Sequence, residues 1–138
     1  GSHKLMFDFA DDTSNRAPEG SLLHVLVPMA ILERMVYYMI EKDYDGANSY
    51  LRSQAIRDRL AAIYAKTIDS PKLQITPLTP VLYNWLAAAL IYSNSHAGRK
   101  VLLEKMGDRI TERPWAYITM PVIGGVNELR ADFQLPPL

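Results

Sequence analysis

The 138-residue chain contains no cysteine. This absence excludes disulfide frameworks, thiol nucleophiles and cysteine metal sites, and it favours a cytoplasmic protein because disulfides belong to oxidising compartments. Histidine is scarce as well. Gly1-Ser2-His3 is typical of the remnant of a cleaved affinity tag, so only His24 and His96 are left as candidate native histidines. Neither has a carboxylate or a second histidine three or four residues away, whereas a metal site needs three or four converging ligands. We therefore predict no metal site and no cofactor.

Groups that support catalysis are also few. Paired carboxylates occur at Asp11-Asp12 and at Asp43/Asp45, and the second pair lies in a turn, where aspartate is common because its side chain bonds nearby backbone. No apolar enclosure is evident that would raise a carboxyl pKa for acid catalysis. Ser95 and His96 could suggest a Ser–His hydrolase site, but the sequence beside them offers no loop that could form an oxyanion hole. We therefore predict no catalytic residue and no enzymatic activity.

The chain has no excess charge of either sign, since its 15 Lys and Arg balance its 15 Asp and Glu. A balanced chain argues against a strong general attraction to nucleic acid or to an anionic membrane. The distribution is uneven: residues 1–45 carry 8 acids and 4 bases, net −4, and residues 46–113 carry 10 bases and 5 acids, net +5. The basic part offers a surface for phosphates or an acidic partner, or a solvated face that the acidic segment partly balances. The basic patch that we single out comprises Arg52, Arg59, Lys66, Arg99 and Lys100.

Uncharged apolar runs long enough to cross a bilayer are missing. Residues 22–40 approach that length but contain Glu33 and Arg34, and each charge near the centre of a span costs about 2.5–3.5 kcal/mol on insertion. The apolar run over residues 80–92 is shorter than the roughly 20 residues that a span needs. We predict no membrane span.

The run over residues 80–92 is the strongest structural signal in the chain. Asn84 is its only strongly polar residue, so a helix here is apolar on every side and predicts the buried centre of the domain, with Trp85 at its middle. Thr79 is expected to cap this helix, and Pro80 suits its first position because the missing N–H has no helical partner there. Asn84 needs a buried hydrogen-bond partner or a place at the rim.

Apolar residues recur at helical spacing on both sides of this centre. Ser21 is the expected N-cap of the first pattern, which Pro28 should kink or divide because proline removes a backbone donor. The expected segments are residues 22–27 and 28–42, a second helix from a cap at Asp45 or Asn48 to about residue 68, a short helix over residues 99–106 stopped by Gly107, and a last short helix over residues 126–133.

These patterns predict an all-α protein: a compact bundle of about four to six helices around a central apolar helix at roughly residues 80–94. Residues 1–20 show no helical period and are predicted to be a tag remnant followed by a flexible acidic arm. Residues 21–133 should form a single helical domain. Residues 134–138 should form an extended tail.

The composition favours a contact surface over an active site, because the chain is rich in Met (6) and Tyr (8) and both suit interfaces. We predict a non-catalytic protein–protein interaction or assembly module, an adaptor or scaffold subunit that binds a protein partner or itself. The alternative is a nucleic-acid-binding accessory protein that uses the basic surface of residues 52–66 and 99–113. An aromatic pair on the arm either docks into a groove or stays disordered. The candidate partner-binding residues are Phe7, Phe9, Tyr37, Tyr38 and Tyr44.

Overall fold

The computed structural model describes residues 2–95, 97–117 and 122–138. Helices are the only regular elements among these residues, so the all-α fold class is confirmed. The elements are α1 (Ser2–Arg16), the 3-10 helix η1 (Leu22–Val25), α2 (Leu26–Ile40), α3 (Tyr44–Leu51), α4 (Gln54–Lys66), α5 (Thr79–Tyr92), α6 (Arg99–Met106), the 3-10 helix η2 (Trp115–Tyr117) and α7 (Val122–Asp132).

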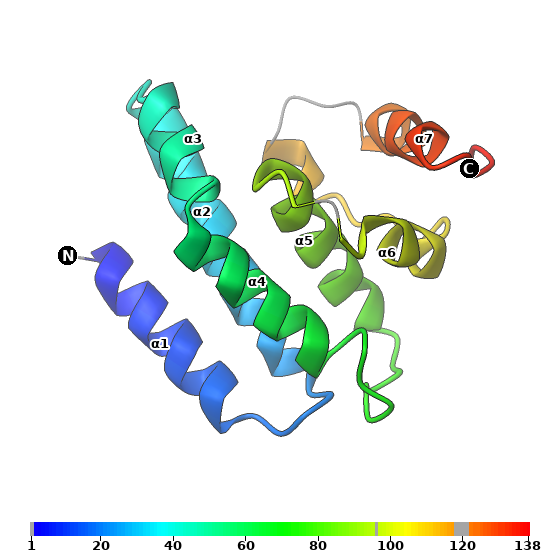
Figure 1. Ribbon diagram of the computed structural model, residues 1–138, viewed down its shortest axis with the longest axis horizontal. Helices are drawn as coiled ribbons and strands as arrows, with labels where there is room; N and C mark the ends of the chain where they lie inside the picture. Colours follow the sequence, from blue (N-terminus) through cyan, green and yellow to red (C-terminus); the bar gives the residue numbers. More distant parts are fainter. Residues whose placement is uncertain (1, 96, 118–121) are drawn as a thin grey trace.

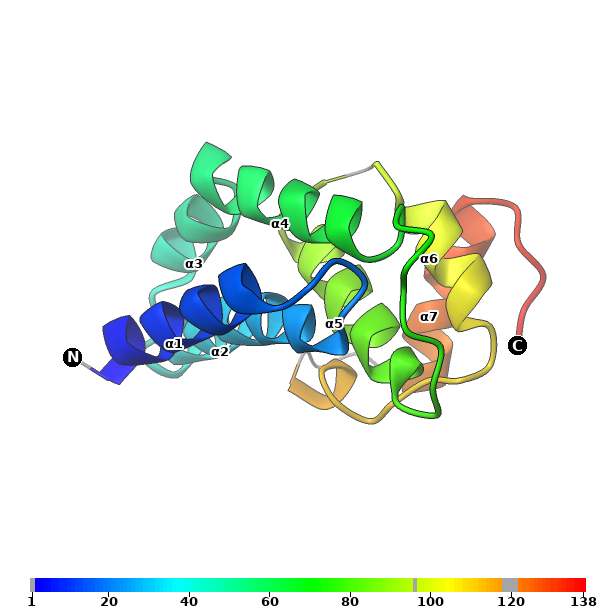
Figure 2. The ribbon, with the colours of Figure 1, turned by 90° about the horizontal axis from the view of Figure 1, so that it is seen from below.

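Helix α5 lies between two groups of helices (Figures 1 and 2). Helices α1, α2, α3 and α4 lie on one side, with α1 packed along α2, and α6 and α7 lie on the other. α5 contacts α2, α4 and η1 from the first group and α6 from the second. The helix predicted to be central is therefore the element that joins both halves of the molecule.

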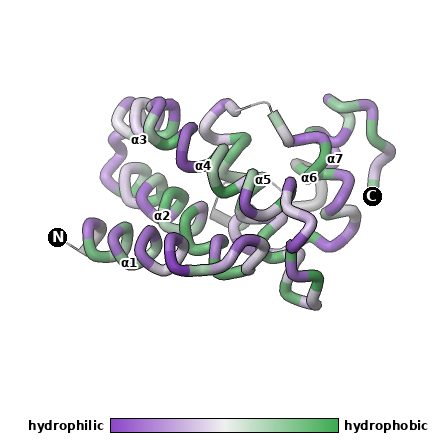
Figure 3. Tube along the Cα trace, turned by 60° about the horizontal axis from the view of Figure 1, so that its bottom comes forward, coloured by the Kyte–Doolittle hydropathy of each residue, from purple (hydrophilic) through white to green (hydrophobic). Residues whose placement is uncertain are grey.

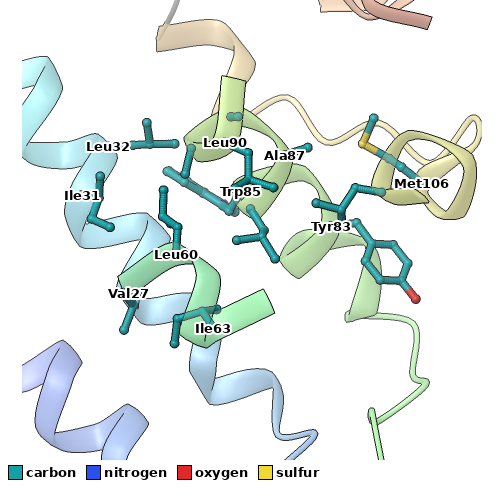
Figure 4. Close-up of a cluster of buried hydrophobic side chains, with 14 of the residues drawn as sticks. Val27, Ile31, Leu32, Leu60, Ile63, Tyr83, Trp85, Ala87, Leu90 and Met106 are labelled. Carbon is teal, nitrogen blue, oxygen red and sulfur yellow. The ribbon is translucent and has the colours of Figure 1, made fainter. Parts of the chain in front are cut away.

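The burial of α5 agrees with its sequence. Every residue from Leu82 to Leu90 is buried, and Figure 4 shows the ring of Trp85 among side chains from α2, α4 and α5. Pro80 occupies the first turn, as expected. Thr79 does not cap the helix, because the helix already includes it; its hydroxyl donates to the carbonyl of Gln74 at 2.8 Å and accepts from the N–H of Thr76 at 2.8 Å.

Asn84 is fully buried and all four of its hydrogen-bonding positions are used. Its Nδ2 donates to the carbonyls of Pro80 at 2.7 Å and Arg109 at 2.9 Å. Its Oδ1 accepts from the backbone N–H of Thr111 at 3.2 Å and from Nε1 of Trp115 at 2.8 Å. The polar residue of the central helix therefore holds the segment that follows α6, including the buried Trp115, against α5.

Residues 2–16 form a helix instead of the flexible arm that we expected. Ala10 and Ser14 are buried and Phe7 is half-buried, and positions 7, 10 and 14 lie on one helical face. That face packs on α2, while hydrophilic and hydrophobic residues alternate along α1 (Figure 3). The sequence did not predict this helix because its buried face carries only one large apolar residue, Phe7. The helix is stabilised by packing on the rest of the domain.

Three further boundaries differ from the prediction. The helix expected from residue 45 or 48 to about residue 68 is divided into α3 and α4, because Ser53 donates to the carbonyl of Tyr50 at 2.8 Å and accepts from the N–H of Ile56 at 3.4 Å. Asp43, and not Asp45 or Asn48, caps α3 through the N–H of Gly46 at 2.9 Å. The last helix begins four residues earlier than expected, at residue 122.

Other boundaries agree with the sequence. Ser21 caps η1 through the N–H of Leu23 at 3.2 Å. The segment before α3 is divided into η1 and α2, so that Pro28 lies in the first turn of α2, where its missing N–H is tolerated. α6 spans the predicted residues and ends at Gly107, whose φ of 53° lies in the left-handed region that favours glycine.

His24 joins α1 to the segment that follows it. The imidazole is fully buried; Nε2 lies 3.0 Å from the carbonyl of Pro18 and Nδ1 lies 2.7 Å from Oγ of Ser14. A carbonyl can only accept, so Nε2 carries the proton and Nδ1 of the neutral ring accepts from the serine hydroxyl. Burial is the main cause that lowers the pKa of His24 below its ordinary value, although the bond to Pro18 opposes it.

Replacement of Asn84 tests its role in the core. Asn84→Leu should lower the free energy of unfolding by about 2–6 kcal/mol. The N–H groups of Trp115 and Thr111 would each be left without an acceptor, and each such buried donor costs about 1–3 kcal/mol. Urea denaturation measures this loss. The exposed Asn48 of α3 provides the control, since Asn48→Leu should change stability by less than about 0.5 kcal/mol. Equal losses for the two variants would contradict the assignment.

Titration of His24 should make stability depend on pH. The folded pKa lies below the unfolded value, so the unfolded state takes up a proton first as the pH falls. The contribution of the neutral ring is complete above about pH 6.5 and is lost as the pH falls through the folded pKa. Urea denaturation between pH 8 and pH 5 should show a steeper loss for the native chain than for His24→Gln. Parallel curves would rule out this contribution.

Candidate functional site

Two arginines and three aromatic rings form a cluster between α1, α2, α3 and α4, which we call the Arg–aromatic cluster. The ring of Phe7 meets that of Tyr50 edge to face, with centroids 6.3 Å apart. The guanidinium of Arg34 lies 5.2 Å from the centroid of Tyr50 and 5.6 Å from that of Tyr38, and Arg59 lies 5.0 Å from the centroid of Phe7. These distances are typical of cation–π contacts. Phe7 is therefore docked on its own domain.

The hydroxyl of Tyr50 is the buried side-chain polar atom without a hydrogen-bond partner among the described residues. Burial is the main cause that raises the pKa of Tyr50, and the nearby charges of Arg34 and Arg59 oppose it. The phenol therefore stays protonated at neutral pH, and the two guanidinium groups are stabilised by ring faces.

The candidate partner-binding residues divide into two groups. Phe7 and Tyr38 are half-buried in the Arg–aromatic cluster, where both rings contact Tyr50. Phe9, Tyr37 and Tyr44 are exposed large side chains. Tyr37 and Tyr44 lie at the junction of α2 and α3, whereas Phe9 lies on α1, so the structure does not gather the five residues into one surface.

Two members of the predicted basic patch have intramolecular partners. Arg59 forms an ion pair with Asp11 of α1. Arg99 donates to the carbonyls of Leu90 at 3.2 Å and Ile91 at 3.4 Å, where the negative end of the α5 dipole favours a cation. Arg57 of α4 also binds the end of α5, because it donates to the carbonyls of Ser93 and Asn94 at 3.3 Å each. Lys66 is half-buried, and Arg52 and Lys100 are exposed.

A cavity of about 780 Å³ lies between α4, the end of α5 and the start of α6. Its charged side chains are Arg57, Asp58 and Asp69. Arg57 is held by the backbone carbonyls at the end of α5, and Asp58 accepts from Nε2 of Gln54 at 2.8 Å. Asp58 and Asp69 are solvent-exposed, so the charged groups of this cavity have their partners in the protein or in solvent.

A second cavity, of about 500 Å³, has a different character and is named here the η1–α5 groove. Two exposed aliphatic side chains line it: Leu23 and Leu78 are 51% and 66% exposed. No lining side chain is charged. The lining residues are Ser21, Leu22, Leu23, Val25, Leu26, Gln74, Leu78, Val81 and Leu82.

Backbone contacts hold the walls of this groove in place. Gly20 donates to the carbonyl of Lys66 at 2.8 Å and accepts from the N–H of Gln74 at 2.9 Å, and Oε1 of Gln74 accepts from the N–H of Leu22 at 3.4 Å. Gly20 has a φ of 82°, and an added Cβ would lie 2.0 Å from the carbonyl oxygen of Lys72. Only glycine permits this approach.

Sequence reasoning missed the groove because its walls are about 50 residues apart in the chain. Leu23 follows the helical pattern expected of a core residue, and Ile75 and Leu78 lie in a connector with two prolines. The apolar residues of that connector were the available signal, since loops at a surface are usually polar.

Comparison with known proteins assigns no family: the chain matches no protein-family model, no curated protein and no solved structure. Residues 2–95, 97–117 and 122–138 contain no group of three His, Cys, Asp or Glu side chains that could hold a metal ion. Among the same residues, Leu22–Ile40 is long and apolar enough to cross a membrane by length and composition. That match is weak evidence, because core helices of folded proteins pass the same test.

The nucleic-acid alternative has a direct test. We expect no shift of duplex DNA or single-stranded RNA in a low-salt gel, because Arg59 and Arg99 already have intramolecular partners. A shift that weakens steeply with added salt would contradict this expectation, since each neutralised phosphate releases counterions. If a shift is seen, Lys100→Ala should reduce the slope of log affinity against log salt concentration by about one.

Proposed function

We propose that this chain is a non-catalytic protein–protein interaction or assembly module whose η1–α5 groove receives apolar side chains from a helix of a partner protein. The observation that carries the proposal is that Leu23 and Leu78, both more than half exposed, line a groove without a charged lining residue. Single exposed aliphatic residues are common on soluble proteins, whereas a grouped apolar patch marks a contact surface.

The chemistry of the groove favours apolar anchors. Burial contributes about 25 cal/mol per Å² of apolar surface removed from water, so aliphatic or aromatic side chains gain most in an uncharged groove. The groove is bounded by η1, α2, α5 and an irregular connector, and the N–H of Gln74 is already bonded to Gly20. A partner cannot extend a sheet here, so we favour an amphipathic helix laid along the groove.

Photo-crosslinking tests the proposal at residue resolution. A photoreactive amino acid at position 78 of the full chain should give discrete adducts in a lysate of the source cell. The same amino acid at Glu104, an exposed position of α6, should not give these adducts. Mass spectrometry of the adducts should map them to an amphipathic helix of the captured protein.

A blocking variant separates specific contact from general stickiness. Leu23→Asp places a charge in the groove that Leu78 also lines and, because Leu23 is exposed, leaves the core intact. It should reduce the yield of the adducts at position 78 at least about tenfold, since a lost anchor costs about 1.4 kcal/mol or more. Unchanged adducts, or identical adducts from positions 78 and 104, would contradict the proposal.

A further inference from the structure

The cavity of about 780 Å³ between α4, the end of α5 and the start of α6, which we call the α4–α6 cleft, has the size of a small-molecule site. Part of its lining is apolar: Leu90 of α5 is buried, and Val101 of α6 presents an aliphatic side chain. Two carboxylates, those of Asp58 and Asp69, line the same cleft. The α4–α6 cleft therefore combines apolar surface with negative charge.

The two carboxylates lie toward opposite ends of the α4 wall of the cleft. Asp58 is in the second turn of α4, whereas Asp69 follows the helix and its N–H donates to the carbonyl of Tyr64 at 3.2 Å. Because an α-helix rises about 1.5 Å per residue, Asp58 and the turn that carries Asp69 are about 10 Å apart along the axis. Ala61 lies between them on the same wall, and its single methyl group leaves an apolar path between the two charges.

Among the described residues, no cation forms an ion pair with either carboxylate. The acids of the ion pairs are Asp8, Asp11, Asp12 and Glu19. Oδ1 of Asp58 accepts from the neutral amide of Gln54. Arg57 also lines the cleft, but its guanidinium donates to the carbonyls of Ser93 and Asn94, where the negative end of the α5 dipole offsets its charge. A cationic ligand would therefore replace solvent at the two carboxylates.

The ring of Tyr64 is fixed on the same wall. Gly98 has a φ of 84°, and an added Cβ there would lie 2.4 Å from Cε2 of Tyr64, so the glycine backbone packs directly against the ring. Burial raises the pKa of the Tyr64 phenol, and the charge of Asp69 raises it further, so the phenol stays protonated near that carboxylate. A neutral aromatic ring close to a carboxylate favours a cation, because both attract positive charge.

We propose that the α4–α6 cleft binds a linear aliphatic polyamine whose two terminal ammonium groups meet Asp58 and Asp69. Its methylene chain then crosses Ala61 and covers the apolar lining, where burial of each methylene group is favourable. An amine with one charged end would leave one carboxylate in solvent, and an anionic ligand would be repelled at both ends. The α4–α6 cleft shares no lining residue with the η1–α5 groove, so this inference does not rest on the proposed function.

Isothermal titration calorimetry of the full chain with three amines tests the span between the carboxylates. The salt concentration should be about 0.15 M, where attraction between distant surface charges is largely screened. Spermidine should bind saturably with one-to-one stoichiometry. Putrescine is too short to reach both carboxylates, and spermidine acetylated at one terminal nitrogen lacks one charged end, so each should bind about tenfold or more weakly. Equal affinities for the three amines, or no saturable heat with spermidine, would overturn the proposal.

Matched variants locate the site. Asp58→Asn and Asp69→Asn should each weaken spermidine binding about tenfold or more, whereas Asp45→Asn, at an exposed position of α3, should not. Ala61→Leu should block the cleft, whereas Ala65→Leu, on α4 but outside the cleft lining, should bind spermidine like the native chain. Circular dichroism should show native helix content for all five variants, because the substituted side chains are exposed. Equal losses for the three Asp variants, or full binding by Ala61→Leu, would contradict the assignment.

Discussion

The rest of the structure depends on the burial of α5, and that burial depends on the side-chain amide of Asn84. A helix that is apolar on every side can be covered by neighbours all round, but a single unpaired amide at its centre would cost several kcal/mol. Here both N–H groups and both lone pairs of Asn84 are used. The same bonds place Trp115 beside α5, so one polar residue sets where the chain after α6 packs.

The end of α5 shows a related use of charge. Its terminal carbonyls receive donors from Arg57 of α4 and Arg99 of α6, and Asn94 adopts a left-handed φ of 56° as the helix stops. Two arginines that look available in the sequence are thereby held by the backbone of the central helix. On the other side, α7 is tied to α6 by Arg130, whose Nη1 donates to the carbonyl of Leu103 at 3.0 Å.

The proposed contact function depends on how basic and apolar side chains are distributed over the surface. The basic residues are distributed among an ion pair, helix ends and solvent, whereas the exposed Leu23 and Leu78 line the η1–α5 groove together. Leu26 of α2 lines this groove, and the packing of α2 against α1, α4 and α5 holds it in place.

The sequence by itself determined the all-α class, the central helix and its proline start, the extent of α6 with its Gly107 stop, and the need of Asn84 for buried partners. Each follows from local chemistry: hydrophobic periodicity, capping, or the cost of burying a polar group. Only the tertiary structure decided that residues 2–16 form a helix, that Arg59 and Arg99 are internally paired, and that Leu23 and Leu78 share a groove. These features depend on contacts between residues tens of positions apart, and a side chain alone does not reveal which distant backbone or ring will meet it.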